Sequence, residues 1–266
     1  SVVTSNKELV AKHGAELLDI AAKNNLNFLF EASVGGGIPI IRPLNRSLTA
    51  DVITEINGIL NGTTNYILSK MELEGLPFDV VLKEAQELGY AERNPEADVE
   101  GHDACRKIAI LSSIAHGLQV DYENIYTEGI TKISDKDMLY AKKLKSSIKL
   151  IATCKTVEEG NYARVAPMLL PSNHPLADVD GVYNAVHVKG NMVGSLKFQG
   201  KGAGKLPTAS AVVADIVDAA KHLHVTIPMY WDQEKLHLMN IDDALVKFFI
   251  RVASTIQRKQ ANIERL

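Results

Sequence analysis

The chain has 266 residues, of which 46% are hydrophobic and 23% charged, with 18 Gly and 9 Pro. These proportions fit a globular protein of one or two domains and exclude a disordered, collagen-like or disulfide-rich chain. Lys and Arg total 29 against 32 Asp and Glu, so a net charge of -3 favours neither nucleic acid nor an anionic membrane surface as a partner. No apolar run approaches the roughly 18 residues that span a bilayer. Cys105 and Cys154 lack metal-ligand spacing and indicate reduced thiols in a cytoplasmic protein.

The first part of the chain predicts a βαβ unit. Residues 1–4 (SVVT) are typical of a short buried strand, Ser5-Asn6 of a helix cap, 8–24 of a helix and 27–31 (NFLFE) of a second strand. A right-handed crossover makes two such strands parallel. Because the chain opens without Met inside a predicted strand, and a doubly wound sheet needs more than two strands, we expect an upstream segment to be missing.

The middle of the chain changes from this pattern to helices followed by adjacent strands. We expect a strand at 51–59, helices at 66–74, 77–88, 103–116 and 134–144, and strands at 148–156, 162–170, 183–188 and 195–198. Ser134 is a cap candidate, and Lys189-Gly190-Asn191 predicts a hairpin turn. Such an order predicts an α+β layer beside the α/β unit.

The last part of the chain contains a second glycine cluster, Gly200–Gly204 (GKGAG), before a helix predicted at 208–222. Pro207 stands at the helix start, and the helix is rich in small apolar residues, so we expect it to be buried. Trp231 is expected in the core. Residues 245–252 (LVKFFIRV) predict one more strand, and 253–266 form a polar segment with some helical character.

The two glycine clusters are candidate ligand sites. Gly35-Gly36-Gly37 follows a strand, where glycines let the backbone approach a ligand or turn its carbonyls around a cation. A tight turn before Pro39 is an equally good interpretation of the triplet alone. The GKGAG cluster is not a dinucleotide fingerprint, because position 205 is Lys. An anion-binding nest of backbone N–H groups at the helix start remains the alternative.

The densest polar stretch runs from residue 90 to residue 107, YAERNPEADVEGHDACRK. Asp103 and Lys107 are four residues apart on one helical face and can form an ion pair. One interpretation is a solvated acidic loop with a surface pair; the other is a site where carboxylates hold an amino-containing substrate and a lysine exchanges a proton with it. Lys7 is either an exposed lysine at a helix start or a cation that faces a cofactor or substrate. Three histidines without metal spacing are interpreted as structural or surface groups: His13, His102 and His116.

Together these segments resemble homoserine dehydrogenase. The resemblance covers about residues 1–240, and it is most specific at 57–68 (NGILNGTTNYIL) and at 89–111 (GYAERNPEADVEGHDACRKIAIL). Further matching segments are 2–17, 30–44 and 200–216. The resemblance implies NAD- or NADP-linked interconversion of L-homoserine and L-aspartate 4-semialdehyde, a step toward methionine, threonine and isoleucine.

The resemblance also implies an α/β fold: a remnant of a doubly wound Rossmann-type domain plus an α+β substrate-binding and dimerisation domain. The implied divisions are the end of the NAD(P)-binding domain at 1–40, the catalytic and dimerisation domain at 41–199, a glycine segment and helix that return to the nucleotide-binding domain at 200–230, and a tail at 231–266. The sheet of the catalytic domain implies a homodimer. Neither nucleic acid nor a membrane is expected as a partner.

Site roles are implied by the resemblance, position by position. Lys107 matches the proton donor in aldehyde reduction, Glu92 the residue that binds the substrate amino group, and Asp98 and Asp103 the same pocket. Lys7 matches a lysine near cofactor and substrate. Gly202 and Gly204 match the glycine segment that returns to the cofactor. A sodium-type monovalent cation is expected at four positions whose oxygens, mostly backbone carbonyls, would hold it: Glu31, Val34, Gly36 and Ile38.

The chain departs from the family at both ends. Homoserine dehydrogenases begin with a strand, a GxGxxG-type turn and a helix that cradle the pyrophosphate, and none of these is in the sequence, so we expect this chain alone to bind NAD(P) poorly and to be inactive. Residues 245–252 resemble the first strand of a regulatory ACT domain, but the segment 253–266 is too short to complete one. Two alternatives stay open: another small-substrate dehydrogenase, acting on aspartate or saccharopine, and a non-catalytic dimerising fragment or paralogue.

Overall fold

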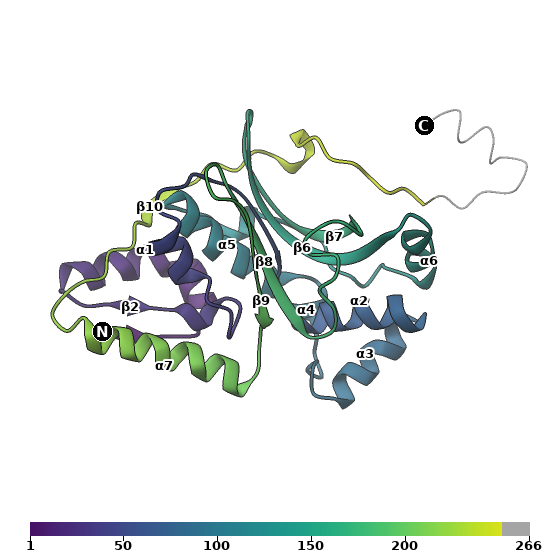
Figure 1. The fold of residues 1–266 in the computed structure, drawn as a ribbon, viewed down its shortest axis with the longest axis horizontal. Coiled ribbons are helices and arrows are strands. Elements are labelled where there is room, and N and C mark those ends of the chain that lie inside the picture. The colour runs from purple at the N-terminus through teal and green to yellow at the C-terminus, as the bar shows by residue number, and fades with distance from the viewer. Residues whose placement is uncertain (252–266) are drawn as a thin grey trace, which may run out of the picture.

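The computed structural model describes residues 1–251, and Figure 1 shows two adjacent parts. On one side α1 (Lys7–Lys23) and α7 (Lys205–Lys221) lie on either side of the short strands β1 (Val2–Val3) and β2 (Phe28–Leu29). On the other side a large curved sheet carries most of the remaining helices. The predicted mixture of helices and strands is therefore confirmed.

The small part is the βαβ unit that the sequence predicts. β1 pairs with β2 in parallel, with Val2 opposite Phe28. The Asn6 side chain caps α1 by accepting hydrogen bonds from the backbone N–H groups of Glu8 and Leu9, each at 3.1 Å. Trp231 is buried against Gly14 of α1, which confirms its place in the core.

The large sheet has six strands among the described residues, in the order β5-β7-β6-β3-β8-β9. They are β3 (Ile53–Ile59), β5 (Tyr126–Thr127), β6 (Ser146–Val157), β7 (Gly160–Pro171), β8 (Tyr183–Gly190) and β9 (Gly194–Lys201). All neighbours are antiparallel except β5 and β7. The predicted hairpin turn at 189–191 is displaced to 191–193, because pairing continues to Gly190 opposite Gly194. The Asp51 carboxylate holds this turn by accepting the N–H groups of Met192 and Val193.

Helices cover one face of this sheet (Figure 1). They are α2 (Gly62–Glu74), α3 (Phe78–Glu87), α4 (Glu96–Val99), α5 (His102–His116) and α6 (Asp135–Lys143). The main core forms where buried Ile108 and Leu111 of α5 meet the sheet residues Leu150 and Ala152. A smaller cluster on the other face includes Ile151 and contains residues of the connection between β7 and β8. Ser134 caps α6 in a capping box with Asp137, as its sequence predicts.

Short elements complete the chain and were not predicted from sequence. They are the strands β4 (Leu118–Gln119) and β10 (Asp232–Lys235), the 3₁₀-helices η1 (Glu31–Ser33), η3 (Tyr122–Asn124) and η4 (Ile241–Asp243), and the π-helix η2 (Pro43–Ser47). β4 pairs with β10 in parallel and ties the end of the described chain to α5. None of the helices in the described range is long and apolar enough to span a bilayer.

Three sequence predictions are wrong. Residues 1–4 do not form a buried strand: Val2 is exposed and Val3 only partly buried, because β1 lies in a sheet of two strands. The helix predicted at 208–222 begins at Lys205, and it is not buried: Val213 and Ile216 are about half exposed, because α7 packs on η1 and β1 along one side only. Residues 245–251 of the strand predicted at 245–252 form no strand. There Phe249 packs on Tyr140 and Arg251 pairs with Asp137 instead. Residue 252 and the segment 253–266 lie outside the described residues.

Candidate active site

An open pocket of about 150 Å³ lies where the start of α1 meets the polar stretch before α5. Its lining consists of Lys7, Glu92, Asn94, Ala97, Asp98, Asp103 and Arg106. Four of the residues expected at the substrate site therefore face one cavity. They come from three elements and a loop that are up to about 100 positions apart in the sequence.

Asp103 is the centre of this site. It lies in the first turn of α5, and its carboxylate is almost fully buried. One oxygen, Oδ1, accepts Lys7 Nζ at 2.8 Å, and the other, Oδ2, accepts Lys107 Nζ at 2.7 Å. Burial opposes ionisation of Asp103, but the two ammonium groups outweigh it and hold its pKa well below the usual range. Asp103 therefore remains a fixed negative charge between two cations.

Lys107 lies one helical turn after Asp103 and reaches back to the end of β3. Its Nζ donates to the carbonyl oxygen of Leu60 at 2.7 Å as well as to Asp103. The side chain is only 12% exposed, so the interpretation of this pair as a surface ion pair is wrong. An ammonium group has three N–H donors, and these two contacts leave one for a further acceptor. Lys107 lies behind Asp103 and is not itself part of the pocket lining.

The other two carboxylates differ in their environments. Asp98, on α4, accepts a hydrogen bond from the Asn61 side chain at 2.7 Å. Burial, followed by the nearby charge of Asp103, raises the pKa of Asp98 despite this hydrogen bond. Glu92 is exposed and lines the pocket mouth. Asn61 was not among the site residues predicted from sequence, so its contact with the site was missed.

The two glycine clusters lie against each other. Gly36 has a left-handed backbone (φ +54), and a Cβ atom there would stand 2.5 Å from the carbonyl oxygen of Gly202. The N–H of Gly37 donates to the carbonyl of Lys201 at 3.1 Å. A side chain at Gly202 would collide with Asn184. The glycines of both clusters therefore permit a backbone-to-backbone approach between distant segments.

This approach predicts a large effect of a methyl group at Gly36. We expect Gly36→Ala to lower the free energy of unfolding by about 3 kcal/mol or more, from left-handed strain plus the clash with Gly202. Gly181→Ala is the matched control, because Gly181 also has a positive φ (+62) but nothing within 4 Å of the added atom. It should cost about 1 kcal/mol. Urea unfolding of both variants measures the difference, and equal losses would contradict the contact.

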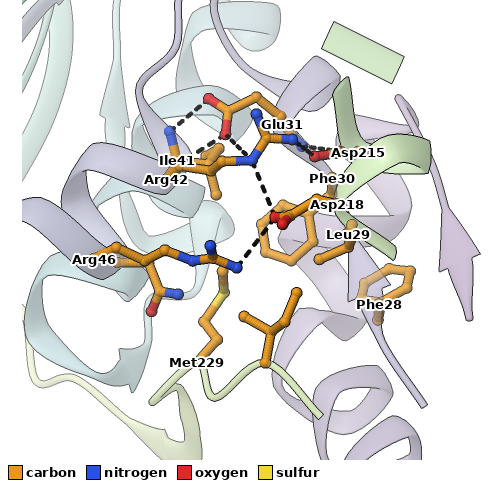
Figure 2. Close-up of a pocket in the computed structure, with 12 residues that line it drawn as sticks. Phe28, Leu29, Phe30, Glu31, Ile41, Arg42, Arg46, Asp215, Asp218 and Met229 are labelled. Carbon is orange, nitrogen blue, oxygen red and sulfur yellow. Dashed lines mark hydrogen bonds and ion pairs between the residues drawn. The ribbon is translucent and has the colours of Figure 1, made fainter. Parts of the chain in front are cut away.

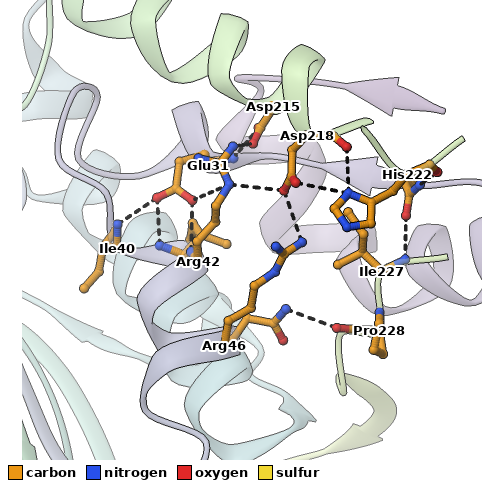
Figure 3. A network of polar contacts seen from close by, with 12 residues as sticks. Glu31, Ile40, Arg42, Arg46, Asp215, Asp218, His222, Ile227 and Pro228 are labelled. Atoms are coloured by element: carbon orange, nitrogen blue, oxygen red, sulfur yellow. Dashed lines mark hydrogen bonds and ion pairs between the residues drawn. The ribbon is translucent and has the colours of Figure 1, made fainter. Parts of the chain in front are cut away.

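The positions expected to hold a cation surround the same bend. The Glu31 carboxylate accepts three backbone N–H groups, those of Ile40 at 2.7 Å and of Ile41 and Arg42 at 2.9 Å (Figure 3). Burial raises the pKa of Glu31, and these hydrogen bonds counteract it. The carboxylate of Glu31 is already hydrogen-bonded to these N–H groups. The oxygen that Glu31 can offer a cation is therefore its backbone carbonyl.

The other three positions expected to bind the cation, Val34, Gly36 and Ile38, would also do so through their backbone carbonyl oxygens. In the described part of the chain no backbone hydrogen bond ends on the carbonyl oxygens of Val34, Gly36 or Ile38. No group of three His, Cys, Asp or Glu side chains converges to form a metal site within residues 1–251. This donor set, hard and uncharged, fits a monovalent cation better than a transition metal.

A network of ion pairs fastens α7 to the segment after this bend (Figures 2 and 3). The buried Asp215 carboxylate accepts the N–H of Glu31 at 2.8 Å and pairs with Arg42. One turn later, Asp218 pairs with Arg42 at 3.5 Å, Arg46 at 3.1 Å and His222 at 3.2 Å. Sequence reasoning missed this network, although acids three apart in an apolar helix were a signal for it.

The chain is similar to known homoserine dehydrogenases. The sequence profile of the homoserine dehydrogenase family matches residues 39–217. A homoserine dehydrogenase of Neisseria gonorrhoeae is 50% identical over 220 residues, which are 83% of this chain and 51% of that protein. The crystal structure of a homoserine dehydrogenase from Thiobacillus denitrificans has 50% identity and a TM-score of 0.81, covering 83% of this chain and 51% of that one.

A hyperthermophilic archaeal homoserine dehydrogenase, solved in complex with NADPH, has 33% identity and a TM-score of 0.74, with 86% of this chain and 65% of that chain covered. The chain spans about half the length of the curated relatives it matches. The fold, together with these matches, is of the mixed α/β class found in solved dehydrogenase structures. The chain belongs to the homoserine dehydrogenase family.

Proposed function

We propose that the protein containing this chain interconverts L-homoserine and L-aspartate 4-semialdehyde with NAD or NADP. The observation that supports this most is Asp103, held between Lys7 and Lys107 beside a pocket that Glu92 and Asp98 also line. Family membership of this segment favours the reaction over the alternatives of an aspartate or saccharopine dehydrogenase and of a non-catalytic paralogue.

The chemistry is set by where charge develops. The nicotinamide cofactor, when bound, supplies or accepts the hydride. In aldehyde reduction, negative charge grows on the substrate oxygen, and the free N–H of Lys107 stabilises and then protonates that oxygen. Asp103 fixes the positions of both lysines. Glu92 and Asp98 bind the substrate ammonium group and so orient the carbonyl.

The glycine clusters are assigned to the cofactor and to a cation. Gly202 and Gly204 lie at the start of α7, and Lys7 at the start of α1, and we assign all three to the cofactor side. The carbonyl oxygens of Glu31, Val34, Gly36 and Ile38 would hold a sodium-type ion. The left-handed glycine bend and the unpaired carbonyls support this assignment.

The remaining assignments rest on the family. We propose a cytoplasmic homodimer formed through the six-stranded sheet, with a nucleotide-binding domain ending near residue 40 and a catalytic domain from 41 to 199. We also propose that the 266-residue chain alone binds NAD(P) poorly and is inactive.

Substrate binding by Glu92 provides the test of the proposed function. In a full-length enzyme that contains this segment, homoserine-dependent formation of NAD(P)H should be measurable at 340 nm. Glu92→Gln should raise KM for L-homoserine about tenfold, because a charged hydrogen bond to the ammonium is lost. Glu96→Gln, an exposed acid outside the pocket lining, should leave KM unchanged. No oxidation of homoserine by the full-length enzyme would overturn the proposal, and oxidation at a normal rate by the 266-residue chain would overturn its proposed inactivity.

A further inference from the structure

Asn61 lies between the end of β3 and the start of α2, and its amide orientation is fixed. Its side-chain oxygen accepts the backbone N–H of Thr64 at 2.8 Å, which makes Asn61 the N-cap of α2. A backbone N–H can only donate, so the atom facing it must be Oδ1. The amide nitrogen therefore points in the other direction.

That nitrogen lies between the buried carboxylate of Asp103 and the partly buried carboxylate of Asp98. Nδ2 donates to Asp98 Oδ1 at 2.7 Å and to Asp103 Oδ2 at 2.9 Å. A side-chain amide has two hydrogens, and each carboxylate receives one. Asn61 is itself 6% exposed, so water competes little for these bonds. One uncharged group thus links α4 and α5 at the point where like charges would repel.

The charges around this amide are uneven. Asp103 has the ammonium groups of Lys7 and Lys107 on its two oxygens. For Asp98, burial raises the pKa most, and the hydrogen bond from the neutral Asn61 amide lowers it; the charge of Asp103 raises this pKa further, and that of Lys107 lowers it. The remaining charged groups at the pocket are Arg106, on the next turn of α5, and Glu92 at the mouth. Asn61 is therefore a substantial factor opposing protonation of Asp98.

We propose that Asn61 is a positioning residue that fixes Asp98 beside Asp103 and keeps Asp98 ionised, so that Asp98 can attract the ammonium group of an amino-acid substrate. The substrate part of this statement rests on the proposed function. The positioning part concerns the described chain alone and is tested without cofactor.

Carbon-13 NMR of the aspartate carboxyls in the 266-residue chain tests the positioning part. Asn61→Ser keeps an N-cap oxygen but removes the two donors, so the titration midpoint of Asp98 should rise by about one pH unit. Asn61→Asp keeps the N-cap oxygen and adds a negative charge, so it should raise the titration midpoint of Asp98 further. Asn240→Ser, which replaces an N-cap Asn that contacts only the N–H of Asp242, should leave it unchanged.

A measurement on the unaltered chain guards against variants that fail to fold. The side-chain amide protons of Asn61 should shift with the same midpoint as the Asp98 carboxyl, because they share a hydrogen bond. Independence of the two titrations would overturn the proposal, as would an unchanged Asp98 midpoint in a folded Asn61→Ser variant.

The substrate part has its own readout in the full-length enzyme. Asn61→Ser should raise KM for L-homoserine at pH values between the two Asp98 midpoints, where the variant's Asp98 is protonated and the original one is not. At higher pH the KM should recover, and kcat at saturating homoserine should change little. A loss of kcat that is equal at every pH would indicate a merely structural role and overturn this part. An enzyme that does not turn over homoserine refutes the proposed function while the NMR result still decides the role of Asn61.

Discussion

Replacement of Lys107 by alanine should abolish turnover in a full-length enzyme that contains this segment, with kcat lowered by about 10³-fold or more. The variant loses the only N–H proposed to reach the substrate oxygen. That contact stabilises the transition state more than the bound substrate, because negative charge grows on this oxygen during the reaction. Cofactor affinity should stay nearly unchanged, because the proposed contact of Lys107 is with the substrate oxygen and not with the cofactor. Steady-state kinetics together with fluorescence titration of NADPH measure the two effects separately.

The control for Lys107 is a lysine that also pairs with an aspartate four residues earlier but does not belong to the candidate site. Lys23 pairs with Asp19 four residues earlier in α1 at 2.7 Å, and both side chains are exposed, so Lys23→Ala should leave kcat unchanged. Lys107→Arg keeps the charge but not the compact ammonium, and it should not restore activity. A kcat of Lys107→Ala within about tenfold of the original enzyme would refute the proton-donor role.

Asp215→Ala should lower the free energy of unfolding by about 3 kcal/mol. The carboxylate is 1% exposed, and its removal leaves the N–H of Glu31 and part of the Arg42 guanidinium buried without their partner. Burial raises the pKa of Asp215, while the hydrogen bond from the Glu31 N–H and the charge of Arg42 act in the opposite direction. Asp215→Asn should cost less, because its amide oxygen can still accept the Glu31 N–H.

Urea unfolding followed by the fluorescence of Trp231, the single tryptophan, measures this loss. Asp19→Ala removes an exposed carboxylate from an ion pair on α1 and should cost at most about 0.5 kcal/mol. An equal, small loss in Asp215→Ala and Asp19→Ala would mean that the network of Figure 3 does not hold α7 in place.

Local signals were sufficient to predict most of the regular elements. α1 and α6 carry side-chain caps, and β6 contains several β-branched residues, such as Ile148, Ile151 and Thr153; each of these features acts within a few residues. The order of the six strands could not be predicted, because it depends on pairing between distant segments. The segment 245–251 shows the same limit, since an apolar run becomes a strand only where a sheet edge is available to pair with it. The prediction that α7 is buried was wrong, because composition does not indicate which sides of a helix pack against other elements.

The candidate site was predicted mainly through the family resemblance. Spacing alone placed Asp103 and Lys107 on one helical face but left open whether the pair is buried. The contact of Asp103 with Lys7, and that of Asn61 with Asp98, join positions 96 and 37 residues apart, which no local pattern can reveal. The roles of these residues in catalysis remain predictions until the variants above are measured.

The contact between Gly36 and Gly202 has a consequence for ligand affinity. With no side chain between the two main chains, the bend at residues 35–37 cannot shift without displacing the strand end that leads into α7. Suppose that an ion binds at the bend of residues 35–37 and a dinucleotide at the strand end that leads into α7. Binding of either one then changes the equilibrium position of the residues that hold the other. Thermodynamic linkage then requires the ion to alter dinucleotide affinity by the same factor by which the dinucleotide alters ion affinity.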